Sequence, residues 1–532
     1  MIEQRVQTEA YWRDDFSVTD QDVEDLGLSL KEAERPMGIS ELGRSLVVSR
    51  SQREQNLIRR QLAQGTVYRP DAAFTVDERL VFPHLQFALG SVVGQRDGHN
   101  PEYGEFKVVS VQFDDAKPGK TRSFAAELRI PHKLASSQGV PGDAPGALSI
   151  DDLCARYGRL VAGKLESRLQ SSGFVAFRGQ WLSRAMLADL HVGHLNIAEA
   201  AIDVKGQPLR AEELLAELDL PDEIPQAIKE FSVNYALSQD ERFDDVGDDR
   251  RILWSLARWE PDELFSVPAR LRYEPATYDR TKLDVAHLQI EREIDDEASL
   301  LVAPPTAASA RSVTLLLTYP HWRMGTLPLT ARTRVMFPGG KPEQHTRIAF
   351  VDRASRSEFP GWVVHAHQFV HGLQEWYKAS GIPVGAYVRL ERTEDPYRVM
   401  IDVIPRRMQR EWFRMAFRNE NGELGFQMQK RPVSCEYDPL CVMDEADRSA
   451  LDELWAQEEQ RQRSLEEVVS SVFLELARTS PNGLVHSKTV YTAANVLKRC
   501  PPGPVFTTLL RLPQFATTSD GYWVFQERVS VR

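Results

Sequence analysis

The sequence is poor in cysteine and contains no long apolar run. Only four of its 532 residues are cysteines, and their irregular spacing argues against a disulfide framework. No stretch approaches the roughly eighteen apolar residues that a membrane span needs. The first twenty residues carry mixed charges and lack an apolar signal core. These absences predict a protein without membrane-spanning segments that resides in a reducing compartment, and we expect it in the cytoplasm.

Catalytic motifs are also missing. The sequence has no phosphate-binding loop, no dinucleotide-binding fingerprint, no Gly-x-Ser-x-Gly elbow and no His-Glu-x-x-His pair. His365, His367 and His371 have a spacing that would place the first two on one face of a strand, but a metal centre needs further ligands. Cys435 and Cys441 lack zinc-finger spacing. We therefore expect no catalytic residue, metal or cofactor, and we interpret the chain as a binding protein, not an enzyme.

Charge is distributed unevenly along the chain. The net charge is −12, which argues against a uniformly basic nucleic-acid-binding protein. Residues 190–263 hold 18 acidic against 7 basic side chains, a net charge of −11. Residues 311–430 hold 11 acidic against 18 basic ones, a net charge of +7. One segment thus repels phosphate while the other attracts it, so the two are not expected to share a partner.

The chain is too long for a single hydrophobic core. We predict a multi-domain α+β protein of winged-helix modules, a small β-barrel and a strand-rich, pseudobarrel-like domain. Residues 134–149 and 297–312 have the composition of linkers. The predicted segments are a helix-turn-helix-like region (1–66), a small β-barrel (67–133), a winged-helix-like region (148–189), a winged helix (190–263), a basic strand-rich domain (311–430), a charged helix (442–464) and a second winged helix (465–526).

Residues 190–263 carry the most specific pattern. Helices are predicted at 196–204, 210–218 and 224–237, with a short strand at Pro208-Leu209. Residues 242–254 follow as strand, turn and strand, with Val246 to Asp249 at the tip. The residues from Gln207-Pro208-Leu209-Arg210 through Asp240-Glu241-Arg242-Phe243 to Trp254 resemble the HARE-HTH winged helix, the domain of the RNA polymerase delta subunit.

This resemblance implies a winged-helix fold. Such a fold can bind DNA or dock on a protein, and the charge of the segment decides between these two functions. A recognition helix on DNA is disfavoured because Lys229 is the only base on the third predicted helix. Docking on a protein is favoured, and the family makes RNA polymerase a candidate partner. We interpret the acidic run 240–249 as a solvated wing tip and not as a metal site.

Residues 465–526 are similar to the same winged-helix class. A helix at 465–477 is followed by a helix at 488–499 that Ser487 is placed to cap, then by a proline-opened helix and a hairpin that closes at Tyr522-Trp523. The candidate nucleic-acid contacts here are Lys488, Lys498 and Arg511. A solvated helix face explains these bases equally well.

Residues 311–430 are the best candidate for DNA contact. A predicted helix at 371–380, then Gly385 and an alternating strand at 386–390, resembles the pseudobarrel DNA-binding domains over residues 311–405. Arginines mixed with aromatic residues suit phosphate contact and stacking, although half-buried strands with arginine on the wet side are a common alternative. The candidate contacts are Arg323, Arg332, Arg334, Lys341, Arg347, Trp376, Tyr377, Arg406, Arg407, Arg410 and Arg414.

Together these patterns predict a DNA- or transcription-associated binding protein. Its winged helices would dock on protein, and its basic strand-rich domain would contact nucleic acid. Two alternatives remain: a subunit of a DNA-processing or restriction-related enzyme with scattered carboxylates and a lysine, and a protein–protein scaffold that binds no nucleic acid.

Overall fold

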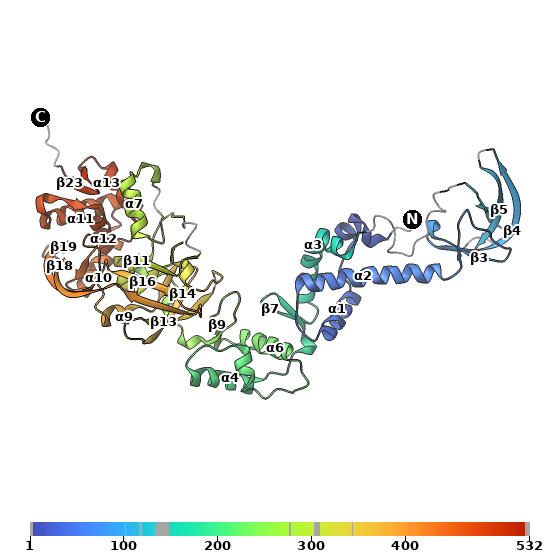
Figure 1. Ribbon diagram of the computed structural model, residues 1–532, viewed down its shortest axis with the longest axis horizontal. Helices are drawn as coiled ribbons and strands as arrows, with labels where there is room; N and C mark the ends of the chain where they lie inside the picture. The colour runs from blue at the N-terminus through green and yellow to red at the C-terminus, as the bar shows by residue number, and fades with distance from the viewer. Residues whose placement is uncertain are drawn as a thin grey trace. The chain divides into compact units, whose positions relative to one another are not determined.

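The computed structural model describes residues 4–101, 103–115, 120–130, 132, 148–275, 278–299, 301–302, 309–342 and 344–526. The chain is mixed α and β, and its described residues form six sheets (Figure 1). It divides into two compact units, Met1–Ile197 with Leu215–Gln239, and Ala198–Leu214 with Asp240–Arg532. Most of the predicted linker at 134–149 and half of that at 297–312 lie outside the described residues. Within the described ranges, no helix is long and apolar enough to span a bilayer.

One core in the first unit joins two segments that the sequence suggested were separate. Leu42 and Leu46 pack in the same cluster as Leu153 and Leu165. Since β1 also pairs with β8, residues 1–66 and 148–189 contribute to one body. The elements are α1 (Asp20–Ala33), β1 (Met37–Gly38), α2 (Ile39–Leu62), α3 (Ile150–Gln170), β7 (Phe174–Phe177) and β8 (Gln180–Ser183).

Between α2 and α3 the chain forms a curled five-stranded sheet. Its strands follow the chain order and are β2 (Thr66–Val67), β3 (Arg79–Phe82), β4 (Ala88–Asn100), β5 (Gly104–Phe113) and β6 (Thr121–Ala126). Phe82 on β3 and Phe124 on the last strand have ring centroids only 4.6 Å apart. The Tyr68 hydroxyl donates to the Ala125 carbonyl at 2.8 Å. These contacts join the first strands of the sheet to the last one and show that the sheet bends into a half-barrel.

Residues 190–263 form the predicted sequence of elements. These are α4 (Val192–Lys205), α5 (Ala211–Leu215), α6 (Gln226–Ser238), β9 (Phe243–Asp245) and β10 (Trp254–Leu256). Leu209 bridges Trp254, as the predicted short strand requires. On α6, Ile228 and Phe231 join the apolar core that contains Phe174 of the first unit.

A seven-stranded mixed sheet lies at the centre of the second unit. In spatial order its strands are β11 (Ser312–Leu316), β16 (Tyr387–Arg392), β17 (Arg398–Val403), β13 (His345–Asp352), β14 (Glu358–Val364), β15 (Phe369–His371) and β12 (Thr326–Pro328). Only β13 and β17 run parallel. The helix expected at 371–380 is the shorter α9 (Gln374–Ala379), and α8 (Tyr319–Met324) precedes β12.

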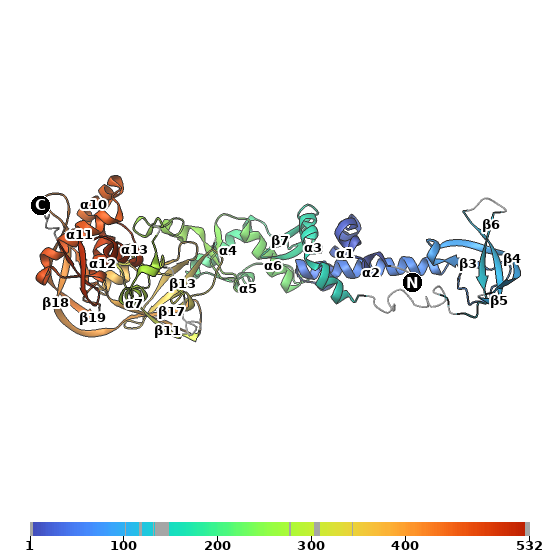
Figure 2. The same cartoon turned by 90° about the horizontal axis from the view of Figure 1, so that it is seen from above.

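The chain then enters a long hairpin of β18 (Pro405–Arg418) and β19 (Leu424–Cys435), with β20 (Met443–Glu445) alongside β18. Figure 2 shows this hairpin, in orange, along the margin of the second unit. The predicted charged helix is α10 (Arg448–Arg461). The hairpin therefore lies between the seven-stranded sheet and the C-terminal helices in sequence.

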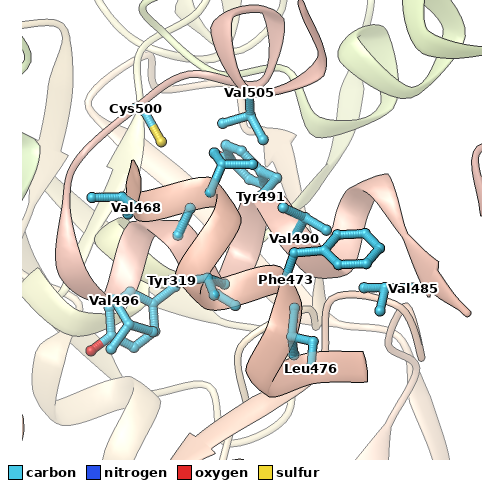
Figure 3. Packing of buried hydrophobic residues seen from close by; sticks show 14 of the residues in the cluster. Tyr319, Val468, Phe473, Leu476, Val485, Val490, Tyr491, Val496, Cys500 and Val505 are labelled. Carbon is cyan, nitrogen blue, oxygen red and sulfur yellow. The ribbon is translucent and has the colours of Figure 1, made fainter. Parts of the chain in front are cut away.

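The C-terminal module contributes most of one large apolar core of the second unit (Figure 3). Val468 and Phe473 of the first helix and Val490 and Tyr491 of the second contribute to this core. Its helices and strands are α11 (Leu465–Thr479), β21 (Val485–His486), α12 (Ser487–Leu497), α13 (Pro502–Arg511), β22 (Phe515–Ser519) and β23 (Tyr522–Phe525), with α7 (Val285–Ile294) packed against them.

Three stretches of the chain thus repeat one order of elements: helix, short strand, two helices, two strands. In each, the short strand or bridging residue pairs with the final strand, as β1 does with β8, Leu209 with Trp254 and β21 with β23. In the first stretch the curled sheet is inserted between the second and third helices.

Candidate nucleic-acid interface

The β18–β19 hairpin has one buried and one partly solvent-facing side. Phe413 and Val433 point into the core of the seven-stranded sheet. On the opposite side, near the turn, Ala416 and Phe426 pack in the C-terminal core. Because side chains alternate along a strand, the rest of this second side is directed to solvent.

The exposed part of this side combines an indole ring with cations. Arg410, Trp412 and Arg414 alternate along β18, and Lys430 is the cross-strand partner of Trp412. Trp412 is 55% exposed, and the Lys430 Nζ atom lies 5.2 Å from its ring centroid. Arg414 is half-buried, and burial lowers its pKa. We call Arg410, Trp412, Arg414 and Lys430 the hairpin patch.

A β-bulge adds two more arginines at the open end of the hairpin. The ladder shifts register between Pro405 and Gln409, and all three intervening residues are exposed. Arg406 lies 6.0 Å from the Tyr437 ring centroid and 3.7 Å from Glu411. Within the described part of the chain, Arg407 makes no ion pair, and neither does Arg410 of the patch. Bulges commonly redirect side chains at binding sites.

The other basic residues of the strand-rich domain that were predicted to contact nucleic acid differ in how accessible their side chains are. Arg334, at the start of a short 3-10 helix, and Lys341, in the loop before β13, are exposed. Arg332 donates to the Thr314 carbonyl at 3.2 Å and lies 3.4 Å from Asp295. The Arg347 guanidinium is half-buried between the rings of two tryptophans, 5.0 Å from Trp259 and 5.8 Å from Trp362. Its contacts with both rings make this cation part of the packing inside the unit, and burial lowers its pKa.

Three predicted contacts of this domain are wrong, because their side chains are buried. Arg323 forms ion pairs with Glu445 at 3.0 Å and Asp452 at 2.7 Å. Trp376 and Tyr377 on α9 lie in the sheet's apolar core, where the Tyr377 hydroxyl donates to the Thr326 carbonyl. Aromatic residues on a helix that packs against a sheet are enclosed by it and cannot stack on a base.

The C-terminal candidates are also engaged inside the protein. Lys488 is buried between Glu293 and Asp438, with Nζ 2.7 Å from each carboxylate. Lys498 donates to the Arg463 carbonyl at 2.6 Å, and Arg511 pairs with Glu466. Lys488 is therefore excluded from nucleic-acid contact, and Lys498 and Arg511 already have protein partners.

The wing tip was predicted to be solvated, and this prediction is wrong, because the tip docks on the strand-rich domain. Val246 is fully buried, and its carbonyl accepts from the Arg347 backbone N–H at 3.0 Å. The Thr346 hydroxyl donates to the Gly247 carbonyl at 3.1 Å, and the Asp248 backbone N–H donates to the Tyr397 hydroxyl at 3.2 Å. The wing tip therefore contacts the strand-rich domain of the same chain and is not a free surface.

One buried cluster has the geometry of a hydrolase triad. The His287 ring lies 2.7 Å from Asp284 through Nδ1 and 2.9 Å from the Ser487 Oγ atom through Nε2. Ser487 is fully buried, and its Oγ atom also accepts from the Trp523 indole N–H at 2.9 Å. A nucleophile needs access to substrate. Here the hydroxyl instead holds α7 to the C-terminal module.

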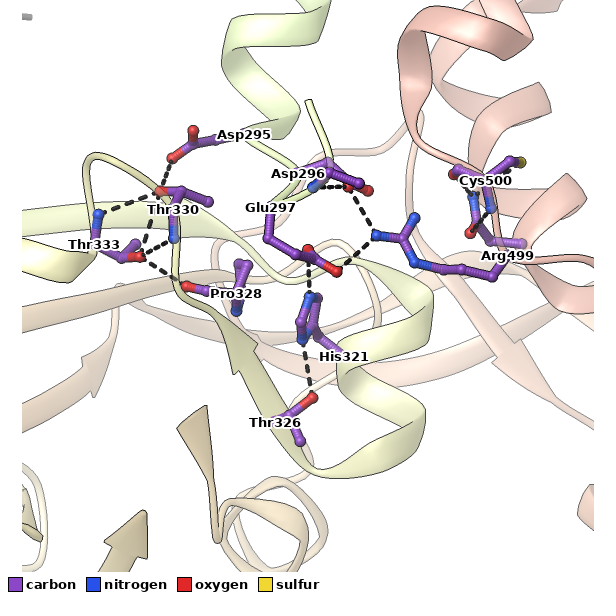
Figure 4. Close-up of polar contacts among 12 residues, drawn as sticks. Asp295, Asp296, Glu297, His321, Thr326, Pro328, Thr330, Thr333, Arg499 and Cys500 are labelled. Carbon is purple, nitrogen blue, oxygen red and sulfur yellow. Dashed lines mark hydrogen bonds and ion pairs between the residues drawn. The ribbon is translucent and has the colours of Figure 1, made fainter. Parts of the chain in front are cut away.

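A second buried cluster consists of charges (Figure 4). Arg499 lies 2.7 Å from both Asp296 and Glu297, and His321 contacts Glu297 at 2.9 Å. Burial alone would raise the pKa of Glu297, but Arg499 and His321 hold it well below its usual range. The cluster connects the segment after α7 to α8 and to the C-terminal module.

The three-histidine motif is not arranged as the sequence suggested. His365 and His367 lie in a turn between β14 and β15, and not on one strand face. The His365 Nε2 atom contacts the Thr346 hydroxyl at 3.2 Å. In the parts of the chain that the structure describes, no three His, Cys, Asp or Glu residues are placed to hold a metal ion.

The exposed arginines 406, 407 and 410 are the predicted contacts that the structure brings together. Trp412 and Lys430 were not among the predicted contacts, although the alternation of Arg410, Trp412 and Arg414 was a detectable signal of a shared face. The pairing of Lys430 with Trp412 requires the hairpin register. Comparisons with protein-family models, curated proteins and solved structures found no match.

Proposed function

We propose that this chain is a nucleic-acid-binding protein that contacts an unpaired strand through the hairpin patch. The observation that carries this proposal is the exposed Trp412 ring between Arg410, Arg414 and Lys430. Proteins that bind single strands combine aromatic stacking surfaces with cations that follow the phosphates. Trp412 is 55% exposed, so its ring is open to a ligand instead of filling the core.

The bulge extends the positive surface beyond the stacking ring. Arg406 and Arg407 are exposed at the open end of the same hairpin, and Arg410 lies on β18 between them and Trp412. Since strand residues rise by about 3.3 Å each, this series spans several nucleotides of backbone. A sequence-tolerant mode of binding follows, because every base offers a ring face and every nucleotide a phosphate.

We further propose that the three repeated modules are winged helices used for assembly. The repeated order of elements supports the fold, and the docked tip at Val246 supports an internal role for the second module. The net charge of −11 over residues 190–263 also disfavours phosphate contact. A protein partner, with RNA polymerase as one candidate, would use the remaining surface of this acidic module.

The test is the binding of the full chain to labelled single-stranded and duplex oligonucleotides, measured by fluorescence anisotropy at several salt concentrations. We compare Arg406→Ala/Arg407→Ala with Arg59→Ala/Arg60→Ala, a matched pair of adjacent, exposed arginines on α2. Each lost phosphate contact should reduce the slope of log affinity against log salt by about 0.7 for a single strand. If the chain binds neither oligonucleotide, or if the two double variants have equal effects, the proposal is overturned. The interpretation as a protein–protein scaffold would then be favoured.

A second candidate, a DNA-processing enzyme, is favoured by one cavity. Glu293, Asp438 and Lys488 line a space of about 350 Å³ in the second unit, and carboxylates with a lysine suit metal-dependent phosphodiester cleavage. The Lys488 ammonium, however, already forms ion pairs with both carboxylates. Magnesium-dependent DNA cleavage by the purified chain, abolished by Asp438→Asn, would establish this candidate instead.

A further inference from the structure

The half-barrel of the first unit encloses a cavity of about 440 Å³. Tyr68, Phe82 and Phe124 form one part of its lining, and their rings are in mutual contact, with centroids 4.6 to 5.3 Å apart. Tyr103 and Phe106 line it from the β4–β5 hairpin. Cavities of this volume hold small organic ligands in proteins.

The chemistry of the lining restricts the ligand. None of the described residues that line the cavity is Asp, Glu, Lys or Arg, and the polar ones are tyrosine, histidine and asparagine side chains. Aromatic cages can bind quaternary ammonium groups through cation–π contacts. A charged ligand would lose its hydration here without gaining an opposite charge, which is unfavourable. The lining therefore suits an uncharged ring better than a cation.

The rim has a strained backbone. Leu85 lines the cavity, and the next two residues, Gln86 and Phe87, both adopt left-handed conformations with φ of 53° and 57°. Such conformations are costly for residues other than glycine and are concentrated at binding sites. On the rim formed by the β4–β5 turn, Tyr103 is 45% exposed. Leu85 and Tyr103 are thus exposed residues of the cavity lining.

We propose that this cavity binds a planar, uncharged heteroaromatic ring, supplied either by a nucleobase or by a free small molecule. The ring stacks on the aromatic lining and is sandwiched by Tyr103 at the entrance. His84, which also lines the cavity, offers a hydrogen-bonding group to ring nitrogens and oxygens. This site belongs to a different unit from the hairpin patch, and its existence does not depend on the function proposed for that patch.

The test is isothermal titration calorimetry of the full chain with adenosine, uridine and indole, which lack phosphate and therefore avoid the basic residues of the hairpin. Tyr103→Ala should weaken binding about tenfold, as expected for the loss of one stacking ring. Phe265→Ala is the matched control, because Phe265 is an exposed aromatic residue of the second unit, and it should leave the affinity unchanged. Tyr103 is exposed, so its removal does not open the core.

The outcomes distinguish the two sources of the ring, a nucleobase and a free small molecule. Nucleoside binding without indole binding identifies a nucleobase site, and the reverse identifies a small apolar aromatic ligand. Leu85→Asp provides a second variant: it should weaken binding of the neutral rings. Saturable binding of tetramethylammonium to the wild type, strengthened by Leu85→Asp, would overturn the proposal in favour of a cation cage. Absence of binding by all three ring compounds, or equal affinities of Tyr103→Ala and wild type, would also overturn it.

Discussion

The Lys430 ammonium lies 5.2 Å from the centre of the Trp412 ring, directly opposite it on the β18–β19 ladder. The contact holds a cation beside an indole that is more than half exposed. It orders both side chains before any ligand arrives. Pre-ordered contacts reduce the entropy lost on binding, so this pair is well suited to receive a flexible strand.

Trp412→Ala should weaken single-strand binding about tenfold, because one stacking contact is lost. The unfolding midpoint should change little, since an exposed substitution alters the free energy of unfolding by only about 0.5 kcal/mol or less. Anisotropy titrations and thermal melts check the two expectations. Trp412→Phe is the control and should retain most of the affinity. Unchanged binding by Trp412→Ala would remove the ring from the interface.

Ser487→Ala should destabilise the second unit by about 1–3 kcal/mol, since it leaves the buried His287 and Trp523 nitrogens without the Oγ partner. Denaturant unfolding measures this cost. The same residue should not react with fluorophosphonate probes for activated serines, because Ser487 is fully buried. Labelling of the wild type that Ser487→Ala abolishes would instead show that the cluster is a working triad.

Arg499→Met should destabilise the second unit by about 3–5 kcal/mol, because it leaves Asp296 and Glu297 as buried charges without their cation. Arg478→Met is the control, since Arg478 is exposed and pairs with Glu475 on the same helix. Hydrogen exchange of α12 amides reports the local loss of stability. Equal exchange in the two variants would show that the cluster contributes nothing to stability.

Glu260→Gln should stabilise the protein at high pH. Burial, followed by the neighbouring Asp244 carboxylate, raises the pKa of Glu260 to about 8. The folded state therefore binds a proton more tightly than the unfolded state, and this contribution to stability is lost as pH rises from about 4.3 through 8. The melting temperature of the variant should exceed that of wild type at pH 9 and converge with it near pH 4. A difference that does not vary with pH would contradict this assignment.

Local chemistry in the sequence was sufficient to predict many elements. The helices predicted at 196–204 and 224–237 correspond to α4 and α6. The short strand at Leu209 and the first strand after α6 are also where the pattern predicted them, whereas the second strand begins at Trp254, where the predicted one ends. These features depend on neighbours within a few residues, so a single sequence contains the information.

The burial of charged candidates could not be predicted in this way. Lys488 is neutralised by Asp438, fifty residues away, and by Glu293. Arg323 depends on Glu445 and Asp452, more than one hundred residues later. A basic residue with such distant partners looks the same in sequence as an exposed one. The shared core of α2 and α3 was hidden for a similar reason, because the curled sheet separates the two helices along the chain.

The alternation of the β18–β19 ladder makes two sets of residues independent of each other. Phe413 and Val433 are constrained by the sheet core that they fill, whereas Trp412 and Lys430 contact mainly each other and solvent. Mutations can therefore change what the outer side binds without changing the fold. Among proteins descended from a common ancestor with this one, we expect the inward positions to stay apolar while the outward positions follow the ligand. The hairpin is in this sense a surface on which new specificities can evolve at little cost to stability.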